Sequence, residues 1–448
     1  MRLTLALACL LAVGCSTAAA GKPVDAPVAW PDGRLAYVPN EVIVGYENGR
    51  ERVVRLAPGR AVARAVDAIE RRPDVRFAAP NWIARASLEP LDRGTSAAPG
   101  GWAQDQWNLL ERPGGIRIRR AWDRLIDAGH PGGRGTRIAV VDSGVAFTAA
   151  EGHGLAPDFV PKQFVAPRDF IDDDRLPLDG NGHGTHIAAT IGGAVTLGKP
   201  ASEPDYLTGI AYGAKLMPVR VLDREGAGPA SAVARGIRWA SKKRADVINL
   251  SFQFHPAVSS CDQVPTVCAA VRLAKRRGSL VVAAAGNAIT GEGERGALFP
   301  ARIPGVLGVG ATTENGCLAS YSHYGPGVEV MAPGGGVPAE RGTRRECADD
   351  AQPILSLTYD CYPTCGAAGG AGRGFALRGD AGTSMASAHA AAVAALVIKS
   401  GAAGKRPKPR AIIRRLTCTA HSPGARAFYR AGLIDALRAV RPVVRCKR

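Results

Sequence analysis

The stretch "TRIAVVDSGV", residues 136–145, passes from a short apolar run directly into the carboxylate of Asp142. Unalternating runs rich in Val and Ile are typical of parallel strands that are buried on both faces. Further runs of this kind follow along the chain, namely "KLMPVRVL", "ADVINL", "SLVVAAA", "GVLGVGA" and "VEVMA". The stretch therefore predicts one strand of a parallel sheet that ends in a polar side chain.

Segments with helical periodicity separate these runs. Examples are "PASAVARGIRWASKKR", residues 229–244, and "TVCAAVRLAKRRG", residues 266–278. Strands and helices in alternation are typical of α/β proteins. We therefore predict an α/β fold: a doubly wound, mainly parallel sheet with helices on both faces.

Polar side chains follow three of the predicted strands. Asp142 follows "RIAVV", Ser251 follows "DVINL" and Asn287 follows "VVAAAG". Open α/β sheets place their functional sites beyond the carboxyl ends of the strands. We therefore expect these three side chains at one edge of the sheet, although Asn287 as a simple turn former is an alternative.

A second junction lies in "RGDAGTSMASAHAAAVAALVIKS", residues 378–400, where a Gly-rich loop meets a run of small apolar residues. Ser and Thr are preferred at the N-cap of a helix, because their side-chain oxygens accept hydrogen bonds from its first turn. We expect Thr383 to cap a buried helix and Ser384 to lie exposed at its start.

Three side chains have the types that nucleophilic catalysis by serine requires. A serine hydroxyl needs an imidazole to take its proton, and the imidazole needs a carboxylate to fix its tautomer. Asp142, His183 in "DGNGHGTHIAATIGG" and Ser384 occur in the chain order that subtilisin has. If "VDSG" belonged to an aspartic protease, the chain would need a second such motif, and it has none. His183 and His186 could bind a metal ion as a pair, but the sequence marks no third ligand.

The chain from about residue 117 to its end resembles the catalytic domain of subtilisin-like serine proteases. The resemblance covers the three stretches above and further blocks, including "GIAYGAKLMPVRVLDREGAG", "GIRWASKKRADVINLS", "ALFPARIPGVLGVGAT", "YSHYGPGVEVMAPGGGV" and "TCTAHSPGARAFYRAGLIDALRAV". It implies a serine endopeptidase that acts on polypeptides and needs no cofactor for the chemistry. A catalytically silent relative that serves as an envelope binding protein is the alternative.

The resemblance also implies a role for individual residues. Asp142 would orient His183, His183 would act as general base, and Ser384 would form the acyl-enzyme. The Asn287 side chain and the Ser384 backbone N–H would form the oxyanion hole. Substrate would bind as an added strand, in contact with Gly226, Ala227, Gly228, Ser251, Phe252, Gln253, Ala284 and Gly286.

Two departures from the family pattern stand near the expected cleft. The family usually has glycine at positions 253 and 254, where this chain has Gln253 and Phe254. We expect these side chains to narrow the first pocket and to restrict specificity. Residues 341–379 look like an inserted loop that carries Cys347, Cys361 and Cys365, and we expect disulfides to tie it near the rim of the site.

Composition fits an exported globular protein. Of the 448 residues, 46% are hydrophobic and 21% charged, and the formal charge is +18. The basic residues are mostly scattered single Arg, so we favour a solvated basic surface over nucleic-acid binding and expect no nucleic-acid partner. Outside the leader, eight cysteines form an even set that predicts disulfides, with free thiols and a metal-binding "CxxxC" as alternatives.

The chain is expected to begin with an export signal, residues 1–20, whose apolar run is too short to span a bilayer. Cys15 in "AVGC" resembles the lipidated cysteine of bacterial lipoproteins, and plain cleavage after Ala20 is the alternative. We therefore expect an envelope-associated or extracellular location, with membrane contact only through such a lipid anchor.

The remaining chain divides into further parts. Residues 22–95 are expected to form a small α+β unit, with strands in "NEVIVGYENG" and "VRFAAP" and a helix in "AVARAVDAIERRPD". This unit resembles the family's inhibitory prodomain, which would act as an intramolecular inhibitor. Residues 96–116 read as a linker and processing region, and 117–448 as the peptidase domain, which we expect to be a monomer. We predict no metal site; "DFIDDD", residues 169–174, is acidic enough for calcium, but we favour an exposed acidic turn.

Overall fold

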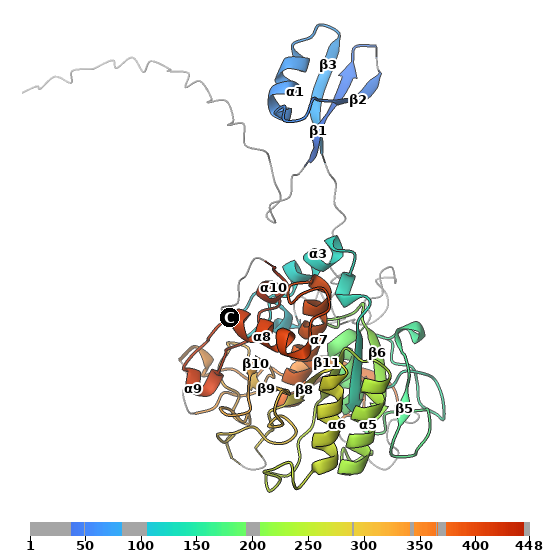
Figure 1. Cartoon of the computed structure of the whole chain (residues 1–448), viewed down its shortest axis with the longest axis vertical. Coiled ribbons are helices and arrows are strands. Elements are labelled where there is room, and N and C mark those ends of the chain that lie inside the picture. Colours follow the sequence, from blue (N-terminus) through green and yellow to red (C-terminus); the bar gives the residue numbers. More distant parts are fainter. Residues whose placement is uncertain are drawn as a thin grey trace, which may run out of the picture. The chain divides into compact units, whose positions relative to one another are not determined.

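The computed structural model divides into two compact units, Met1–Ser87 and Leu88–Arg448, drawn in Figure 1. The structure describes residues 37–48, 50–82, 105–193, 207–288, 291–340, 345–363, 365 and 373–442. The predictions for the export signal 1–20, for Cys15 and for residues 96–104 of the linker lie outside these ranges. The two units are described separately below.

The small unit is a three-stranded antiparallel sheet with one helix. Its elements are β1 (Tyr37–Tyr46), β2 (Glu51–Arg55), α1 (Val62–Glu70) and β3 (Val75–Trp82), with the strand order β2-β1-β3. Val42 and Val44 of β1 form its core together with Val62 and Ala65 of α1. The predicted small α+β unit is thus confirmed, but β2 was not predicted because "ERVVR" has charged residues on both sides of two valines.

The large unit is built on a seven-stranded sheet in which every ladder is parallel. In spatial order the strands are β10 (Val330–Pro333), β9 (Leu307–Thr312), β8 (Leu280–Ala284), β7 (Val247–Leu250), β4 (Arg137–Asp142), β6 (Lys215–Arg220) and β5 (Arg168–Asp169). All six predicted apolar runs are strands of this sheet. The short β5 was not predicted.

Helices cover both faces of the sheet, as alternate residues of a strand point to opposite sides. Ile138 and Val140 of β4 belong to the core that α3 (Arg119–Asp127), α4 (His183–Gly192) and α7 (Thr383–Ser400) help to form. Ala139 and Val141 face α5 (Ala230–Lys242) and α6 (Pro265–Arg276), which run side by side in Figure 1. The predicted doubly wound α/β fold is confirmed. The chain ends in α8 (Pro409–Thr419), α9 (Arg426–Tyr429) and α10 (Ala436–Ala439).

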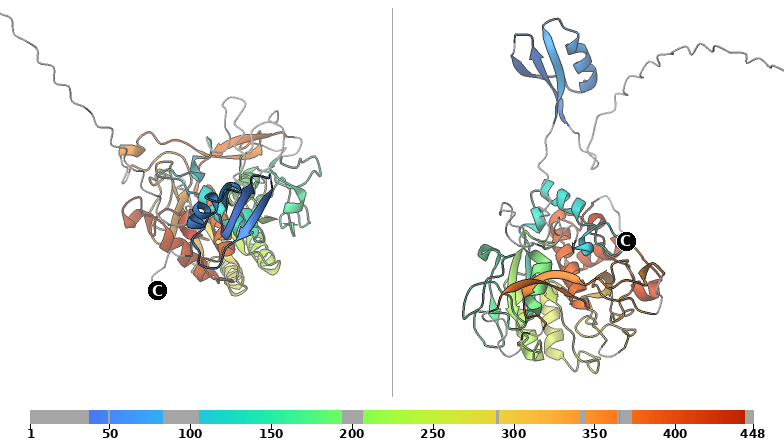
Figure 2. Two further views of the ribbon diagram at one scale, coloured as in Figure 1. Left: turned by 90° about the horizontal axis from the view of Figure 1, so that it is seen from above. Right: turned by 180° about the vertical axis from the view of Figure 1, so that it is seen from behind.

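The inserted segment is more ordered than the sequence suggested. Within residues 341–379 we expected a loop, but β11 (Ile354–Tyr359) pairs with β12 (Phe375–Asp380) in an antiparallel hairpin, which is orange in the right panel of Figure 2. The alternation in "ILSLTY" favours a strand, and the turn residues around it hid that signal.

Among the residues that the structure describes, seven of the eight cysteines are in disulfides, as expected, and Cys446 lies outside these ranges. Three bonds join Cys261 to Cys268, Cys317 to Cys347, and Cys361 to Cys365. Cys418 is disulfide-bonded as well. Within the described ranges, no helix is both long and apolar enough to cross a membrane.

Helix α7 is buried on nearly every side, which its small residues allow. Ala392 is fully buried against the sheet, so Ala392→Leu overpacks the core and should cost about 1–3 kcal/mol of unfolding free energy. Urea unfolding of the two proteins, both carrying Ser384→Ala to suppress any autolysis, measures this cost. The exposed Ala427 is a matched control, and an equal effect of Ala427→Leu would contradict the packing account.

Candidate active site

Asp142 and His183 meet at the carboxyl edge of the sheet. Asp142 ends β4 and is fully buried, whereas His183 is the first residue of α4 and its side chain is 19% exposed. Asp142 Oδ1 lies 2.7 Å from His183 Nδ1 and also accepts the Ser143 N–H at 2.8 Å. Because an ionised carboxylate can only accept, Nδ1 carries a proton and Nε2 is left able to take one.

A second buried carboxylate holds the start of α4 in place. Asp179 Oδ1 accepts hydrogen bonds from the Ser143 hydroxyl (2.9 Å) and the Gly182 N–H (2.9 Å). Its Oδ2 accepts from the Thr185 N–H (2.8 Å) and hydroxyl (2.6 Å). Asp179 thereby holds the start of α4, which carries His183, close to Ser143, the residue after Asp142.

Ser384 lies in the first turn of α7, which brings it to the same edge of the sheet. Its hydroxyl donates to the Ser251 carbonyl oxygen at 2.8 Å, and the Ser251 hydroxyl donates back to the Ser384 carbonyl oxygen at 2.9 Å. Ser251 directly follows β7. Two of the three side chains expected at this edge, Asp142 and Ser251, therefore line one cleft together with Ser384.

The expectation that Thr383 caps α7 is wrong. Gly382 is the N-cap residue, and Thr383 is the first residue of the helix. The Thr383 N–H and hydroxyl both donate to Asn287 Oδ1, at 3.0 and 2.7 Å, and the hydroxyl accepts the Gly286 N–H at 3.2 Å. Since its oxygen is held in this way, the Asn287 amide group presents its Nδ2 donor on the other side, next to Gly382.

Gln253 spans the gap between two backbone segments of the site. Its Oε1 accepts the Asn287 N–H at 2.6 Å, and its Nε2 donates to the Asn287 carbonyl oxygen at 3.1 Å. The side chain therefore crosses from the segment after β7 to the segment after β8. A glycine at position 253 would leave this space open.

The surface around these residues forms a cleft of about 360 Å³. Of the predicted substrate-binding residues, Gly226, Ser251, Phe252, Gln253 and Ala284 line it, together with Asp142, His183 and Ser384. Ala227, Gly228 and Gly286 do not line it. Their assignment as substrate-binding residues stays a prediction.

Sequence reasoning missed several residues of the cleft and its support. Asn181, Leu222, Glu225, Tyr362 and Pro363 also line the cleft. Asn181 and the supporting Asp179 stand beside His183 in "DGNGHGT", so their closeness in sequence was a usable signal. Tyr362 comes from the hairpin far along the chain, and no sequence signal placed it here.

Neighbouring carboxylates set the charge state of His183. Burial lowers the pKa of His183, but the charge of Asp142 and the hydrogen bond to it, with the charges of Asp380 and Asp179, outweigh burial and raise the pKa to about 9. His186, in contrast, is buried and has its pKa lowered to about 4, mainly by burial. Its Nε2 contacts the Arg378 carbonyl oxygen at 3.1 Å, which gives it a structural partner.

Arginines neutralise the acidic stretch 169–174. Arg220 contacts the carboxylates of Asp169 (2.8 Å) and Asp172, while Arg235 lies 2.6 Å from Asp173. In the part of the chain that the structure describes, no three His, Cys, Asp or Glu side chains are grouped as a metal site requires. These carboxylates are therefore accounted for by ion pairs.

Asp142, His183 and Ser384 line one cleft, and these are the residue types with which serine endopeptidases activate a hydroxyl. Residues 133–432 match the profile of the subtilase family, and the chain belongs to that family.

Individual relatives agree with this assignment. The chain is 35% identical to thermitase of Thermoactinomyces vulgaris over 289 residues, which cover 64% of this chain and 82% of thermitase. It is 32% identical to an extracellular protease of Xanthomonas campestris pv. campestris, over 88% of this chain and 66% of that one. Among solved structures, a protease of Pseudoalteromonas arctica PAMC 21717 matches with a TM-score of 0.58 and 28% identity, over 75% of this chain and 96% of that one.

The raised pKa of His183 predicts the pH dependence of activity. His183 must be neutral to accept a proton, so kcat/KM should rise with pH through an apparent pKa near 9. Because the Asp380 charge raises this pKa, Asp380→Asn should move the ascending limb to lower pH. The exposed Asp262 provides the control variant, Asp262→Asn. A limb at the ordinary histidine value of about 6.5, unmoved by Asp380→Asn, would contradict the account.

Proposed function

We propose that this chain is an exported serine endopeptidase, made as a zymogen that processes itself, which hydrolyses peptide bonds through an acyl-enzyme on Ser384. The observation that carries the proposal is the 2.7 Å contact between Asp142 and His183 at the edge where Ser384 lies in the first turn of α7. Family membership supports the same chemistry.

The chemical steps follow from these positions. Ser384 Oγ turns from the Ser251 carbonyl to His183, gives its proton to Nε2 and attacks the carbonyl carbon of the substrate. His183 then passes that proton to the departing amine, which leaves the acyl group on Oγ. Water loses a proton to Nε2, attacks the ester and releases the acid, and the serine hydroxyl is restored.

Two donors are suited to the oxyanion that forms in each attack. Asn287 Nδ2 is oriented by the two hydrogen bonds from Thr383 to Oδ1. The Ser384 N–H belongs to the first turn of α7, where backbone N–H groups have no partner within the helix and the helix dipole favours negative charge. Donors fixed before the reaction stabilise the developing charge without reorganisation.

Maturation and location rest on the arrangement of the sequence. The small α+β unit precedes the peptidase unit, as an inhibitory prodomain would, and we place the cut between residues 84 and 101. The apolar leader supports export, either with a lipid anchor on Cys15 or with plain cleavage after Ala20. An extracellular relative that aligns over 88% of this chain is in keeping with export.

The nucleophile and the maturation step are tested together. Ser384→Ala removes the attacking oxygen, so peptide hydrolysis should fall by several orders of magnitude, about 10⁶-fold where such residues act as a unit. The variant should also accumulate as an uncut precursor, which mass spectrometry of the purified N-terminus detects. Ser400→Ala, at the far end of the same helix, is the comparison variant for folding. Normal-sized mature protein from Ser384→Ala would exclude self-processing.

Gln253 is proposed to restrict the first pocket, which receives the side chain of the residue whose carbonyl is attacked. Its two hydrogen bonds to the Asn287 backbone fill the space between the pocket walls. We therefore expect a preference for small residues in this pocket. Both the family's glycine at this position and the cleft lining support this interpretation.

Gln253→Gly should open the pocket to large side chains. Kinetics with peptides that differ only at the attacked residue should show kcat/KM for Leu or Phe, relative to Ala, rising about tenfold or more. The ratio is the readout because losing the contact to Asn287 lowers turnover for every substrate. Gln263→Gly, in an exposed loop, should leave the ratio unchanged. An unchanged ratio in Gln253→Gly, or indiscriminate cleavage by the unmodified enzyme, would refute the restriction.

A further inference from the structure

The β11–β12 hairpin is bonded to both halves of the site. From β11, the Thr358 hydroxyl donates to the Gly182 carbonyl oxygen at 2.6 Å, and the Ser356 hydroxyl donates to the His186 carbonyl oxygen at 3.1 Å. β12 ends at Asp380 and leads directly into the loop before Ser384. The hairpin therefore connects the helix that begins with His183 to the segment that carries the nucleophile.

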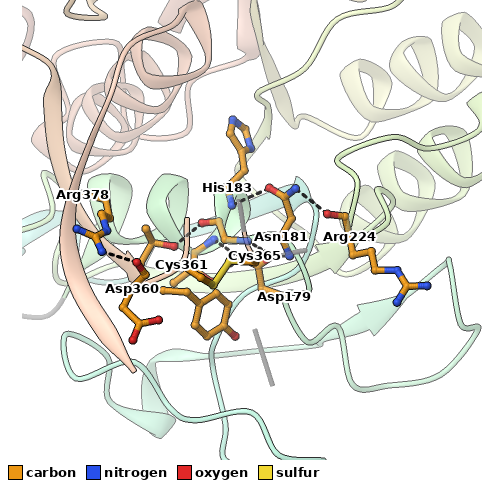
Figure 3. Close-up of a disulfide and its surroundings, with 12 residues drawn as sticks. Asp179, Asn181, His183, Arg224, Asp360, Cys361, Cys365 and Arg378 are labelled. Carbon is orange, nitrogen blue, oxygen red and sulfur yellow. Dashed lines mark hydrogen bonds between the residues drawn. A yellow bond between two sulfur atoms is a disulfide. The ribbon is translucent and has the colours of Figure 1, made fainter. Parts of the chain in front are cut away.

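The tip of the hairpin is fixed close to His183. The Cys361–Cys365 disulfide closes the tip, and Figure 3 shows it beside the loop from Asp179 to His183. Tyr362, inside this closed tip, donates its hydroxyl to the Asp380 carboxylate. The other oxygen of Asp380 accepts the Ala381 N–H at 2.7 Å. One side chain thus bridges the hairpin tip and the loop that leads to Ser384.

The ring of Tyr362 packs on the backbone that precedes His183. A Cβ atom at Gly182 would lie 2.8 Å from Tyr362 Cδ2, and Gly182 has φ 105°, so only glycine fits under the ring. The Tyr362 and His186 rings have centroids 6.0 Å apart. Tyr362 is only 9% exposed, and it lines the cleft with Asn181, His183 and Leu222.

The geometry of an extended substrate indicates which of its residues would lie against Tyr362. In the proposed mechanism, the attacked carbonyl would lie between Ser384 and Asn287, and the side chain of that residue would point toward Gln253. In an extended strand, successive side chains point to opposite sides. The preceding side chain would then point away from Gln253, and we infer that it meets His183, Leu222 and Tyr362, which also line the cleft.

We propose that Tyr362 is a specificity-determining residue that narrows the part of the cleft that receives the side chain preceding the attacked residue. The substrates are then polypeptides with a small residue at that position, because the packed ring leaves no room for a large one. The disulfide and the bond to Asp380 hold the ring in place. This inference rests on the proposed endopeptidase function and names a substrate preference of the same site.

The test is a set of peptides that vary only at the preceding residue, cleaved by the full-length enzyme after maturation. Tyr362→Ala should raise kcat/KM for Leu or Phe relative to Ala at that position by about tenfold or more, since a hydrophobic pocket discriminates by that factor. Preference at the attacked residue should not change. Tyr362→Leu, which keeps an apolar filling, should show a smaller change in the same direction and serves if the alanine variant fails to fold.

The outcomes separate this inference from the proposed function. If the unmodified enzyme cleaves peptides but neither variant changes preference at the preceding residue, Tyr362 does not narrow this part of the cleft. A uniform loss across all peptides would likewise refute the inference and leave Tyr362 a structural residue. If the unmodified enzyme cleaves no peptide, the proposed function itself fails. Tyr212→Leu, a tyrosine packed on Trp122 away from the cleft, should leave the preference unchanged.

The disulfide is tested by a matched pair of double variants. Cys361→Ser with Cys365→Ser frees the hairpin tip and should relax preference at the preceding residue in the direction of Tyr362→Ala. Cys261→Ser with Cys268→Ser removes another short-range disulfide, at the start of α6, and should not. Identical preferences in the two double variants would show that the disulfide does not hold Tyr362 in place.

Discussion

The hydrogen bond between Asp142 and His183 is the contact on which the rest of the site depends. It requires α4 to begin very close to the carboxyl end of β4, and glycines permit this approach. A Cβ atom at Gly184 would lie 2.0 Å from the Gly144 carbonyl oxygen. Asp179 then stabilises the close approach, because it binds Ser143 on one side and Gly182 and Thr185 on the other.

Asn287 connects the proposed oxyanion hole with the proposed first pocket. Its side chain is oriented by Thr383, beside the nucleophile, and its backbone is held by Gln253, in the wall of the first pocket. A change at Gln253 therefore acts both on the space for the substrate and on the position of a proposed oxyanion donor. Tyr362, which also lines the cleft, is bonded to Asp380 and through it to the loop before Ser384. Gln253 and Tyr362 are thus both connected to the groups that we propose to react.

The sequence was most informative where local pattern determines structure. Apolar runs such as "TRIAVV" located the strands, and the polar residues after them met at one edge because parallel strands all end there. Side-chain bonding partners were not predictable in the same way. Thr383 has the residue type of an N-cap, yet it bonds to Asn287, which lies 96 positions away in the chain. Tyr362 reaches the cleft only because a hairpin folds across α4, and contacts between such distant segments leave no periodic signal.

Isolation of the acyl-enzyme tests the central claim most directly. The mature protein would be mixed with a slowly deacylating peptide ester, quenched in acid, digested and mapped by mass spectrometry. The account predicts one added acyl group, on the peptide that contains Ser384, and its absence in Ser384→Ala. An acyl group on another side chain would contradict the account. So would hydrolysis of the ester without any labelling of Ser384, under conditions in which deacylation is slower than acylation.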